Sequence, residues 1–151
     1  MSKTVAMQDV FGNSTTPKTL TASFVADTKA VMYFKYFKKM NLGALFTPGT
    51  TGEFALIQVE TSAYDGTTNP PEASFRVYSD YRQPDANPGT ELDVFGVPFA
   101  VPKDVASPTS ATAYYRSLVI EDLTCNWIRI KAKSSGSSGF GTLYVNVESM
   151  E

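Results

Sequence analysis

The residues that could do chemistry in this chain are few. The 151 residues include no histidine and a single cysteine, Cys125. A Ser-His-Asp triad or a Cys-His pair therefore cannot be built, because both use histidine as the general base. A cysteine without an activating partner is usually a small buried apolar side chain, and we expect this role for Cys125. The same counts exclude an intrachain disulfide and the common Cys/His zinc sites.

Acidic residues are the remaining candidates for catalysis. A glycosidase needs two carboxyl groups about 5 to 10 Å apart, and Glu53, Glu60, Asp65 and Asp80 occur in adjacent predicted strands or loops. The sequence does not bring any two of them together, and we predict that the protein is not an enzyme. The loop at 62–69 could offer oxygen ligands to calcium, but it lacks the spaced acidic pattern of a calcium loop. We expect a simple turn there, and neither a metal nor a cofactor.

Basic residues form two groups that could bind a partner. One group occupies alternate positions of a single predicted strand, and the other lies within and after an aromatic run. The groups are Arg129, Lys131 and Lys133, and Lys35, Lys38 and Lys39. Such positive charges could bind an acidic protein, or they could form a solvated face that keeps a strand from pairing with others. Both interpretations stay open.

The length and overall composition of the chain limit the classes of protein to which it can belong. A chain of 151 residues with 42% hydrophobic and 19% charged residues has the size and composition of one globular domain. The formal charge of -2 gives no general attraction to nucleic acid. The aromatic residues at 33–37 could stack on single strands, but we favour a role in the core. Without a membrane-length apolar run or a secretory signal, we expect synthesis in the cytoplasm and no membrane partner.

Alternation of apolar and polar residues predicts strands along most of the chain. The clearest pair, 127–133 and 142–148, is joined by a Gly/Ser-rich segment, and we interpret it as a β-hairpin. The predicted strands are 19–26, 31–38, 54–60, 75–81, 92–101, 113–120, 127–133 and 142–148. Gly/Pro turns separate them without helical periodicity. We therefore predict an all-β, antiparallel, jelly-roll-like β-sandwich of about eight strands, with an immunoglobulin-like sandwich as the runner-up.

The first residues of the chain allow two interpretations. Residues 17–151 are predicted to form a single β-sandwich domain, whereas residues 1–16 are either an N-terminal arm or the first strand of the sandwich. As an arm, the segment would order only on a neighbour, with Val10 and Phe11 anchored in a groove of the partner. As a strand, residues 5–11 would join the core.

The order of features from Phe54 onward resembles a known class of protein. A strand ending in Val59-Glu-Thr-Ser62, an Asp65-Gly66 turn and a Pro-rich middle come first. They are followed by Ala113-Tyr-Tyr-Arg, Trp127-Ile-Arg-Ile-Lys and Gly141-Thr-Leu-Tyr-Val-Asn-Val147. This pattern is similar to small β-sandwich virion proteins of tailed bacteriophages. The resemblance rests on the arrangement of strands and turns, because no invariant motif is present.

The resemblance implies an accessory protein of the virion. It would be a capsid decoration or cement protein that binds the major capsid protein or another virion protein, or else a component of the tail or neck. A homo-oligomer is implied as well, with a trimer favoured. Carbohydrate-binding sandwiches share much of the pattern, so a glycan-binding module is the alternative function. Exposed aromatic rings would favour that alternative, and the candidates are Tyr78, Tyr81 and Tyr115.

Overall fold

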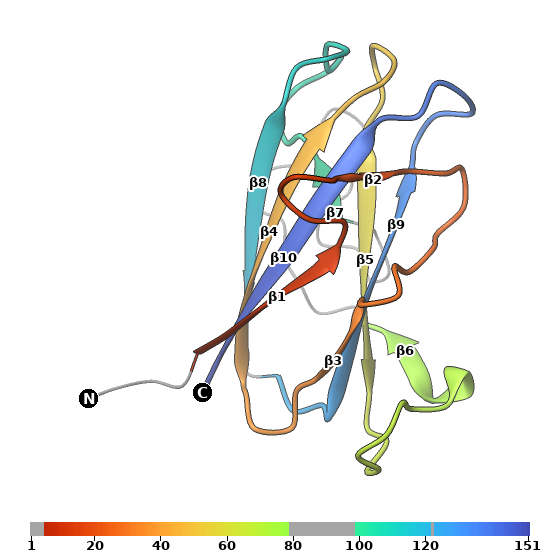
Figure 1. The fold of residues 1–151 in the computed structure, drawn as a ribbon. Coiled ribbons are helices and arrows are strands. Elements are labelled where there is room, and N and C mark those ends of the chain that lie inside the picture. Colours follow the sequence, from red (N-terminus) through yellow and green to blue (C-terminus); the bar gives the residue numbers. More distant parts are fainter. Residues whose placement is uncertain (1–4, 79–98, 122) are drawn as a thin grey trace.

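The computed structural model describes residues 5–78, 99–121 and 123–151, which form ten strands and a short 3₁₀ helix (Figure 1). The strands are β1 (Val5–Phe11), β2 (Lys18–Thr19), β3 (Val31–Tyr33), β4 (Lys39–Thr47), β5 (Ala55–Ser62), β6 (Phe75–Val77), β7 (Phe99–Val101), β8 (Tyr114–Ile120), β9 (Trp127–Ser134) and β10 (Thr142–Met150). The 3₁₀ helix η1 (Glu72–Ser74) directly precedes β6. The described ranges hold no helix with the length and apolar character needed to cross a membrane.

The strands pair into two antiparallel sheets, named sheet A and sheet B. Sheet A has the order β1-β10-β4-β8, and β2 pairs with the end of β10 that β1 leaves free. Sheet B has the order β3-β9-β5, and the second edge of β5 is shared by β6 and β7. The two sheets face each other, as the ribbon shows (Figure 1).

The path of the chain is that of a jelly roll. Successive long strands alternate between the sheets: β1, β4, β8 and β10 lie in sheet A, whereas β3, β5 and β9 lie in sheet B. With β6 and β7 counted as one interrupted strand and β2 as an extension of β1, the sheets follow the strand order of the eight-stranded jelly roll. The predicted antiparallel, jelly-roll-like sandwich is therefore confirmed, with ten strands in place of about eight.

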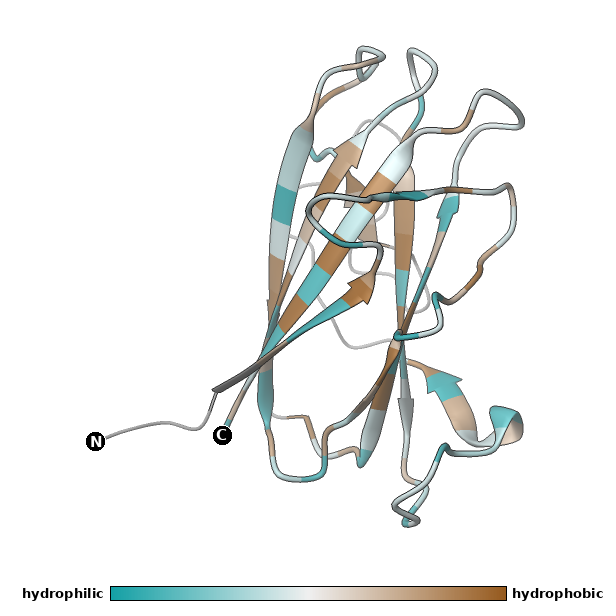
Figure 2. Cartoon of the chain, in the orientation of Figure 1, coloured by the Kyte–Doolittle hydropathy of each residue, from teal (hydrophilic) through white to brown (hydrophobic). Residues whose placement is uncertain are grey.

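The core fills the space between the sheets. On β9 and β10 every second side chain points inward and is fully buried, as the alternation of the sequence predicts; these side chains are Ile128, Ile130, Ala132, Leu143, Val145 and Val147. The same alternation is visible as brown and teal bands along the strands (Figure 2). Each buried Leu, Ile or Val stabilises the folded state by about 1.5–3 kcal/mol. The two sheets are therefore held together mainly by apolar packing.

The predicted hairpin between β9 and β10 is wrong. β9 pairs with β3 and β5 in sheet B, whereas β10 pairs with β1, β2 and β4 in sheet A. The segment 135–141 crosses from one sheet to the other, so the apolar faces of the two strands meet across the core. Local alternation identifies a strand and its buried face, but it does not specify which strand lies beside it.

Two other strand predictions need correction, and one strand was missed. The predicted strand 31–38 is replaced by β3 and a turn, and the central strand β4 was missed because Gly43 and the outward apolar Leu45 weaken its alternation. Of the predicted strand 19–26, only Thr19 belongs to a strand, and Val25 forms an isolated bridge with Ala132. The structure describes residues 75–78 of the predicted strand 75–81, where β6 lies, and residues 99–101 of the predicted strand 92–101, which form β7. The remaining parts of these two predictions lie outside the described residues.

The N-terminal segment contributes a strand to sheet A. Residues 5–11 form β1, which pairs with β10 and has a register shift between Asp9 and Phe11. Val10 and Phe11 are fully buried in the core. The prediction that these two side chains anchor in a partner is therefore wrong, because both are already packed between the sheets of their own domain.

Candidate functional site

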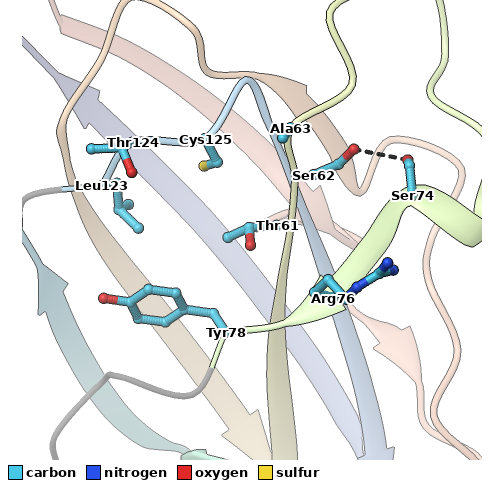
Figure 3. A pocket seen from close by; sticks show the side chains of 9 residues that line it. All are labelled: Thr61, Ser62, Ala63, Ser74, Arg76, Tyr78, Leu123, Thr124 and Cys125. Atoms are coloured by element: carbon cyan, nitrogen blue, oxygen red, sulfur yellow. Dashed lines mark hydrogen bonds between the residues drawn. The ribbon is translucent and has the colours of Figure 1, made fainter.

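A pocket opens at the end of the sandwich where β5 finishes and β9 begins (Figure 3). Its volume is about 500 Å³, and its walls come from β5, the segment from η1 to Tyr78, and the connection before β9. The lining residues are Thr61, Ser62, Ala63, Ser74, Arg76, Tyr78, Leu123, Thr124 and Cys125. The lining is therefore rich in hydroxyl groups and carries one guanidinium group.

The groups in the pocket are poorly suited to catalysis. The Ser62 hydroxyl donates to Ser74 Oγ at 2.8 Å, and Arg76 Nη1 donates to the carbonyl oxygens of Ala73 and Phe75 at 2.9 and 3.2 Å. Burial raises the pKa of the Cys125 thiol to about 11. The thiol is thus protonated at neutral pH, and a protonated thiol is a weak nucleophile.

An ion cluster occupies the outer face of sheet B, and we name it the Arg129 cluster. Arg129 Nε donates to Glu60 Oε1 at 2.6 Å, and both side chains are buried. The other two guanidinium nitrogens, Nη1 and Nη2, donate to the Glu72 carboxylate at 2.7 and 2.8 Å. The guanidinium carbon lies 3.9 Å from the centre of the Phe75 ring, and Lys131 Nζ lies 3.8 Å from Glu60 Oε2. This cluster holds the turn formed by η1 against the sheet.

The pKa values of the cluster follow from these contacts. Hydrogen bonds from Arg129 lower the pKa of Glu72, and the carboxylates of Glu72 and Glu60 raise the pKa of Arg129 against the opposing effect of burial. A carboxyl group whose pKa is lowered in this way is ionised at neutral pH and cannot donate a proton. Glu72 is therefore unsuited to be the acid of a catalytic pair, and Glu60 is held in the cluster by its contacts with Arg129 and Lys131.

Glu53 is committed to a different structural role, at the opposite end of β5. Its buried carboxylate accepts hydrogen bonds from Gly49 N at 2.8 Å, Ser134 Oγ at 2.6 Å and Gly141 N at 3.0 Å. It thereby joins the β4–β5 connection to the β9–β10 connection. Glu53 lies seven residues before Glu60 on an extended chain, roughly 20 Å away, too far for a pair of catalytic carboxyl groups.

The metal hypothesis gains no support from the arrangement of the acids. No group of three or more Cys, Asp or Glu side chains is placed to hold a metal ion within the residues that the structure describes. Asp65 lies in an exposed loop, where its Oδ1 is 3.5 Å from Lys35 Nζ. Asp80, another acid singled out from the sequence, lies outside the described residues.

The outer face of sheet A carries large exposed apolar side chains. The exposed fractions are 67% for Met7 on β1, 38% for Leu45 on β4, and 67% and 50% for Tyr115 and Val119 on β8. The strand registers place Leu45 between Tyr144 of β10 and Tyr115 of β8. Directly opposite residues on one face of a sheet have Cβ atoms about 5 Å apart, so these three side chains form a continuous row.

Gly43 shapes the middle of this face. It lies between Asn146 of β10 and Ser117 of β8, one row along the sheet from Leu45. A Cβ atom at Gly43 would lie only 2.8 Å from both the Tyr115 hydroxyl oxygen and Asn146 Oδ1. The glycine therefore leaves room for the Tyr115 ring to lie across β4. We name the face defined by Met7, Leu45, Tyr115 and Val119 the apolar face.

The predicted basic groups are distributed over several surfaces. Lys35 and Lys39 are paired with acids, Lys35 with Asp65 as described and Lys39 Nζ with Glu121 Oε1 at 3.8 Å, and Lys38 is exposed beside them. Arg129 and Lys131 belong to the Arg129 cluster, so the predicted stripe is not a free basic face. Lys133 Nζ lies 5.0 Å from the centre of the Phe24 ring.

Two parts of these surfaces were not found by sequence reasoning. Glu72 was missed because it is 57 residues from Arg129 and lies in the three-residue 3₁₀ helix η1, which is too short to have a periodic signal in the sequence. The apolar row was missed because β4 itself was missed, although Tyr115 had been singled out. Of the three candidate tyrosines, Tyr115 is exposed, Tyr78 is half-buried in the pocket, and Tyr81 lies outside the described residues.

Comparison with known proteins identifies no family. No protein-family model and no curated protein matches the chain. One similar solved structure is the K3 cleaved adhesin domain of Lys-gingipain from Porphyromonas gingivalis w83, with 10% identity, a TM-score of 0.34, and coverage of 97% of this chain and 71% of that chain. Another is infectious bursal disease virus Gx strain, with 11% identity, a TM-score of 0.29, and coverage of 99% and 40%. At these identities and TM-scores, neither similarity indicates a function for this chain.

Proposed function

We propose that this protein is a non-enzymatic structural subunit of a virus particle, a capsid decoration or cement protein that binds the shell through the apolar face. The observation that carries this proposal is the exposure of Met7, Leu45, Tyr115 and Val119 on one face of one sheet. Large exposed apolar side chains gathered on one face of a folded domain mark interaction sites, and aromatic residues and Met are enriched at protein interfaces. Glu148 and Asn41 lie between Met7 and Val119, so the face is apolar with polar groups interspersed.

Two further observations support this proposal. Jelly rolls occur in viral capsid proteins and in lectins, so the topology is compatible with both a structural and a glycan-binding role. The reactive side chains among the described residues have structural roles or an unreactive form. The Cys125 thiol is protonated, and Glu53, Glu60 and Glu72 stabilise loops and turns through hydrogen bonds. The assignment to a tailed bacteriophage rests on the resemblance in the sequence, and the particle is accordingly the proposed location.

The direct test is attachment to particles of the encoding virus that lack this protein. Leu45→Ser combined with Tyr115→Ser should weaken co-sedimentation at least about tenfold, because truncating side chains at the centre of an interface costs more than about 1 kcal/mol each. Tyr36→Ser is the matched control, because Tyr36 has a similar exposure of 71% but lies in the β3–β4 turn.

The outcome separates the proposal from its competitors. Unchanged attachment of the double variant, or an equal loss with Tyr36→Ser, would contradict a role for the apolar face. Labelled protein on the particle, viewed by electron microscopy, should mark the head. Labelling of the tail or neck would replace decoration of the shell by a role in those parts.

Glycan binding is a second candidate function, and the exposure of Tyr115 favours it. Sugars bind to exposed aromatic rings beside polar groups, and Ser117 and Asn146 lie one row from Tyr115 on the same face. A glycan array probed with the wild-type protein and with Tyr115→Ala tests this function. Binding that is lost in Tyr115→Ala would support it, and an array without binding would remove it.

A further inference from the structure

The edges of the two sheets differ in how they are protected. β3, β6 and β7 form edges of sheet B and have three residues each. β1, at one edge of sheet A, has an irregular register between Asp9 and Phe11, and the Gln8 amide donates to Lys29 O at 3.0 Å. Short strands and bulges are the usual protection of an edge against pairing with another chain.

β8 has none of these protections. It has seven residues, and its register with β4 is unbroken from Met40↔Ile120 to Phe46↔Tyr114. Within the described part of the chain, β4 is its only strand partner. Its exposed side chains, Tyr115, Ser117 and Val119, are uncharged, and the strand has no proline. Its one charged residue, Arg116, points inward and donates to Ala100 O of the same chain. Such an edge is a template for a further antiparallel strand.

We propose that β8 pairs with β8 of a second copy of this chain, antiparallel and with Ser117 on the two-fold axis. In this register Tyr115 lies opposite Val119 of the partner subunit, and the two-fold symmetry produces this pair twice. An aromatic side chain opposite a β-branched one is a favourable cross-strand pair. The strand is thus complementary to itself, as an isologous interface requires.

The charges near β8 are compatible with this register. Arg116 points to the inner face, where its Nη1 donates to Ala100 O at 2.7 Å and its guanidinium carbon lies 4.2 Å from the centre of the Phe99 ring. It falls opposite Leu118 of the second copy, so the two arginines do not face each other. Glu121 falls opposite Ala113. The two Arg116 residues become diagonal neighbours on the inner face, roughly 7–8 Å apart, but each guanidinium group is already held by Ala100 O and the Phe99 ring of its own chain.

The two-fold axis is perpendicular to the joined sheet, which has a consequence for the surface. The apolar faces of both copies point to the same side and form one continuous, double-width face. The pairing uses Tyr115 and Val119 of the apolar face, but it is tested at Ser117 through the oligomeric state and not through attachment to particles, so either proposal can fail without the other. It yields a dimer, in contrast to the trimer that the sequence resemblance implies.

Light scattering after size exclusion tests the pairing on the full chain. The wild type should have twice the monomer mass of 16.4 kDa. Ser117→Lys and Ser117→Asp should each be monomeric, because each places like charges opposite one another across the axis, and an equimolar mixture of the two should recover the dimer. Met7→Lys adds the same charge to the apolar face and should remain dimeric. A wild-type monomer or trimer, or a dimer insensitive to Ser117→Lys, would overturn the proposal.

Cross-linking tests the register independently of whether the charged variants fold. In a Cys125→Ser background, Ser117→Cys should form an intermolecular disulfide on mild oxidation, because paired Cα atoms of antiparallel strands are about 4.5–5.5 Å apart. Tyr115→Cys is the control, because two copies of position 115 would be about 14 Å apart along the strands. Equal cross-linking of both variants, or none at position 117, would rule out this register.

Discussion

The outer faces of the two sheets differ in how much of their surface the chain itself covers. On sheet B, the Arg129 cluster satisfies its own charges, and η1 and Phe75 cover part of the strands. On sheet A, Met7, Leu45 and Tyr115 remain exposed, and no comparable turn covers them among the described residues. The chain thus covers the outer face of sheet B with its own residues, whereas the outer face of sheet A has exposed apolar side chains of the kind found at interaction sites.

We therefore expect substitutions on the two faces to have different effects, on folding for sheet B and on the proposed association for sheet A. Removing a group from the Arg129 cluster should weaken folding, because a buried charge would lose its partner. Removing a side chain from the apolar face should leave folding almost unchanged and weaken association. The predictions that follow test this contrast, beginning with the largest expected effect.

Arg129→Ala should lower the free energy of unfolding by about 3–5 kcal/mol, because it leaves the buried Glu60 carboxylate without its main partner. Urea unfolding monitored by fluorescence measures the change. Lys131→Ala is the control. Its Nζ lies 3.8 and 4.0 Å from the same two carboxylates but is partly exposed, so less than about 1 kcal/mol is expected. A loss as small for Arg129→Ala as for Lys131→Ala would contradict the structural role of the cluster.

Glu72→Gln should change how stability depends on pH. The pKa of Glu72 is lowered from 4.5 in the folded state, chiefly by its hydrogen bonds with Arg129. The carboxylate therefore contributes stability above its unfolded pKa, and this contribution is lost as the pH falls through the lower, folded value. The difference in thermal midpoint between the wild type and Glu72→Gln should be largest near neutral pH and shrink in acid. A difference that grew in acid would have the wrong sign.

Gly43→Ala should change the apolar face more than the fold. The added methyl group would meet the ends of the Tyr115 and Asn146 side chains, which can move aside, so we expect a change in stability within about 1 kcal/mol. The displaced Tyr115 ring should weaken attachment to particles. Thermal unfolding and co-sedimentation measure the two effects. A large loss of stability would show that the ring is fixed in place by the fold.

Leu45→Ser should have a small effect on folding, within about 1 kcal/mol, because 38% of this residue is already exposed and its side chain lies on the outer face of the sheet and not in the core. Urea unfolding measures it against Leu42→Ser on the same strand. Leu42 is fully buried, and its replacement should cost several times more. Similar costs at the two positions would show that Leu45 is already packed within its own chain.

The fold could be predicted from the sequence where burial follows a local pattern. The alternation around Ile128 and Val145 identified β9, β10 and their inward faces correctly. It could not place the two strands in different sheets, because pairing depends on β4 and β5, which lie far away in sequence. It also missed β4, where Gly43 takes a position that an exposed polar residue usually occupies.

The candidate sites were predicted less well, for the same reason. Arg129 was identified as a basic residue with a possible partner, but its partners are Glu60 and Glu72, which are 69 and 57 residues away. One of the two interpretations of the N-terminal segment made Val10 and Phe11 anchors of an arm, because their neighbours are polar, and the other made residues 5–11 a strand of the core. The burial of Val10 and Phe11 becomes evident only once β1 is paired with β10. Long-range pairing, which a local pattern does not contain, decides each of these cases.

Hydroxyl-radical footprinting of the protein, free and bound to particles, tests the central claim most directly. Side chains that are exposed in the free domain lose reactivity where a partner covers them. We predict protection of Met7, Leu45 and Tyr115 on the apolar face, and unchanged reactivity of Tyr36 in its turn and of Val77 on sheet B. Protection of Tyr36 and Val77 with unchanged reactivity of Tyr115 would contradict the account.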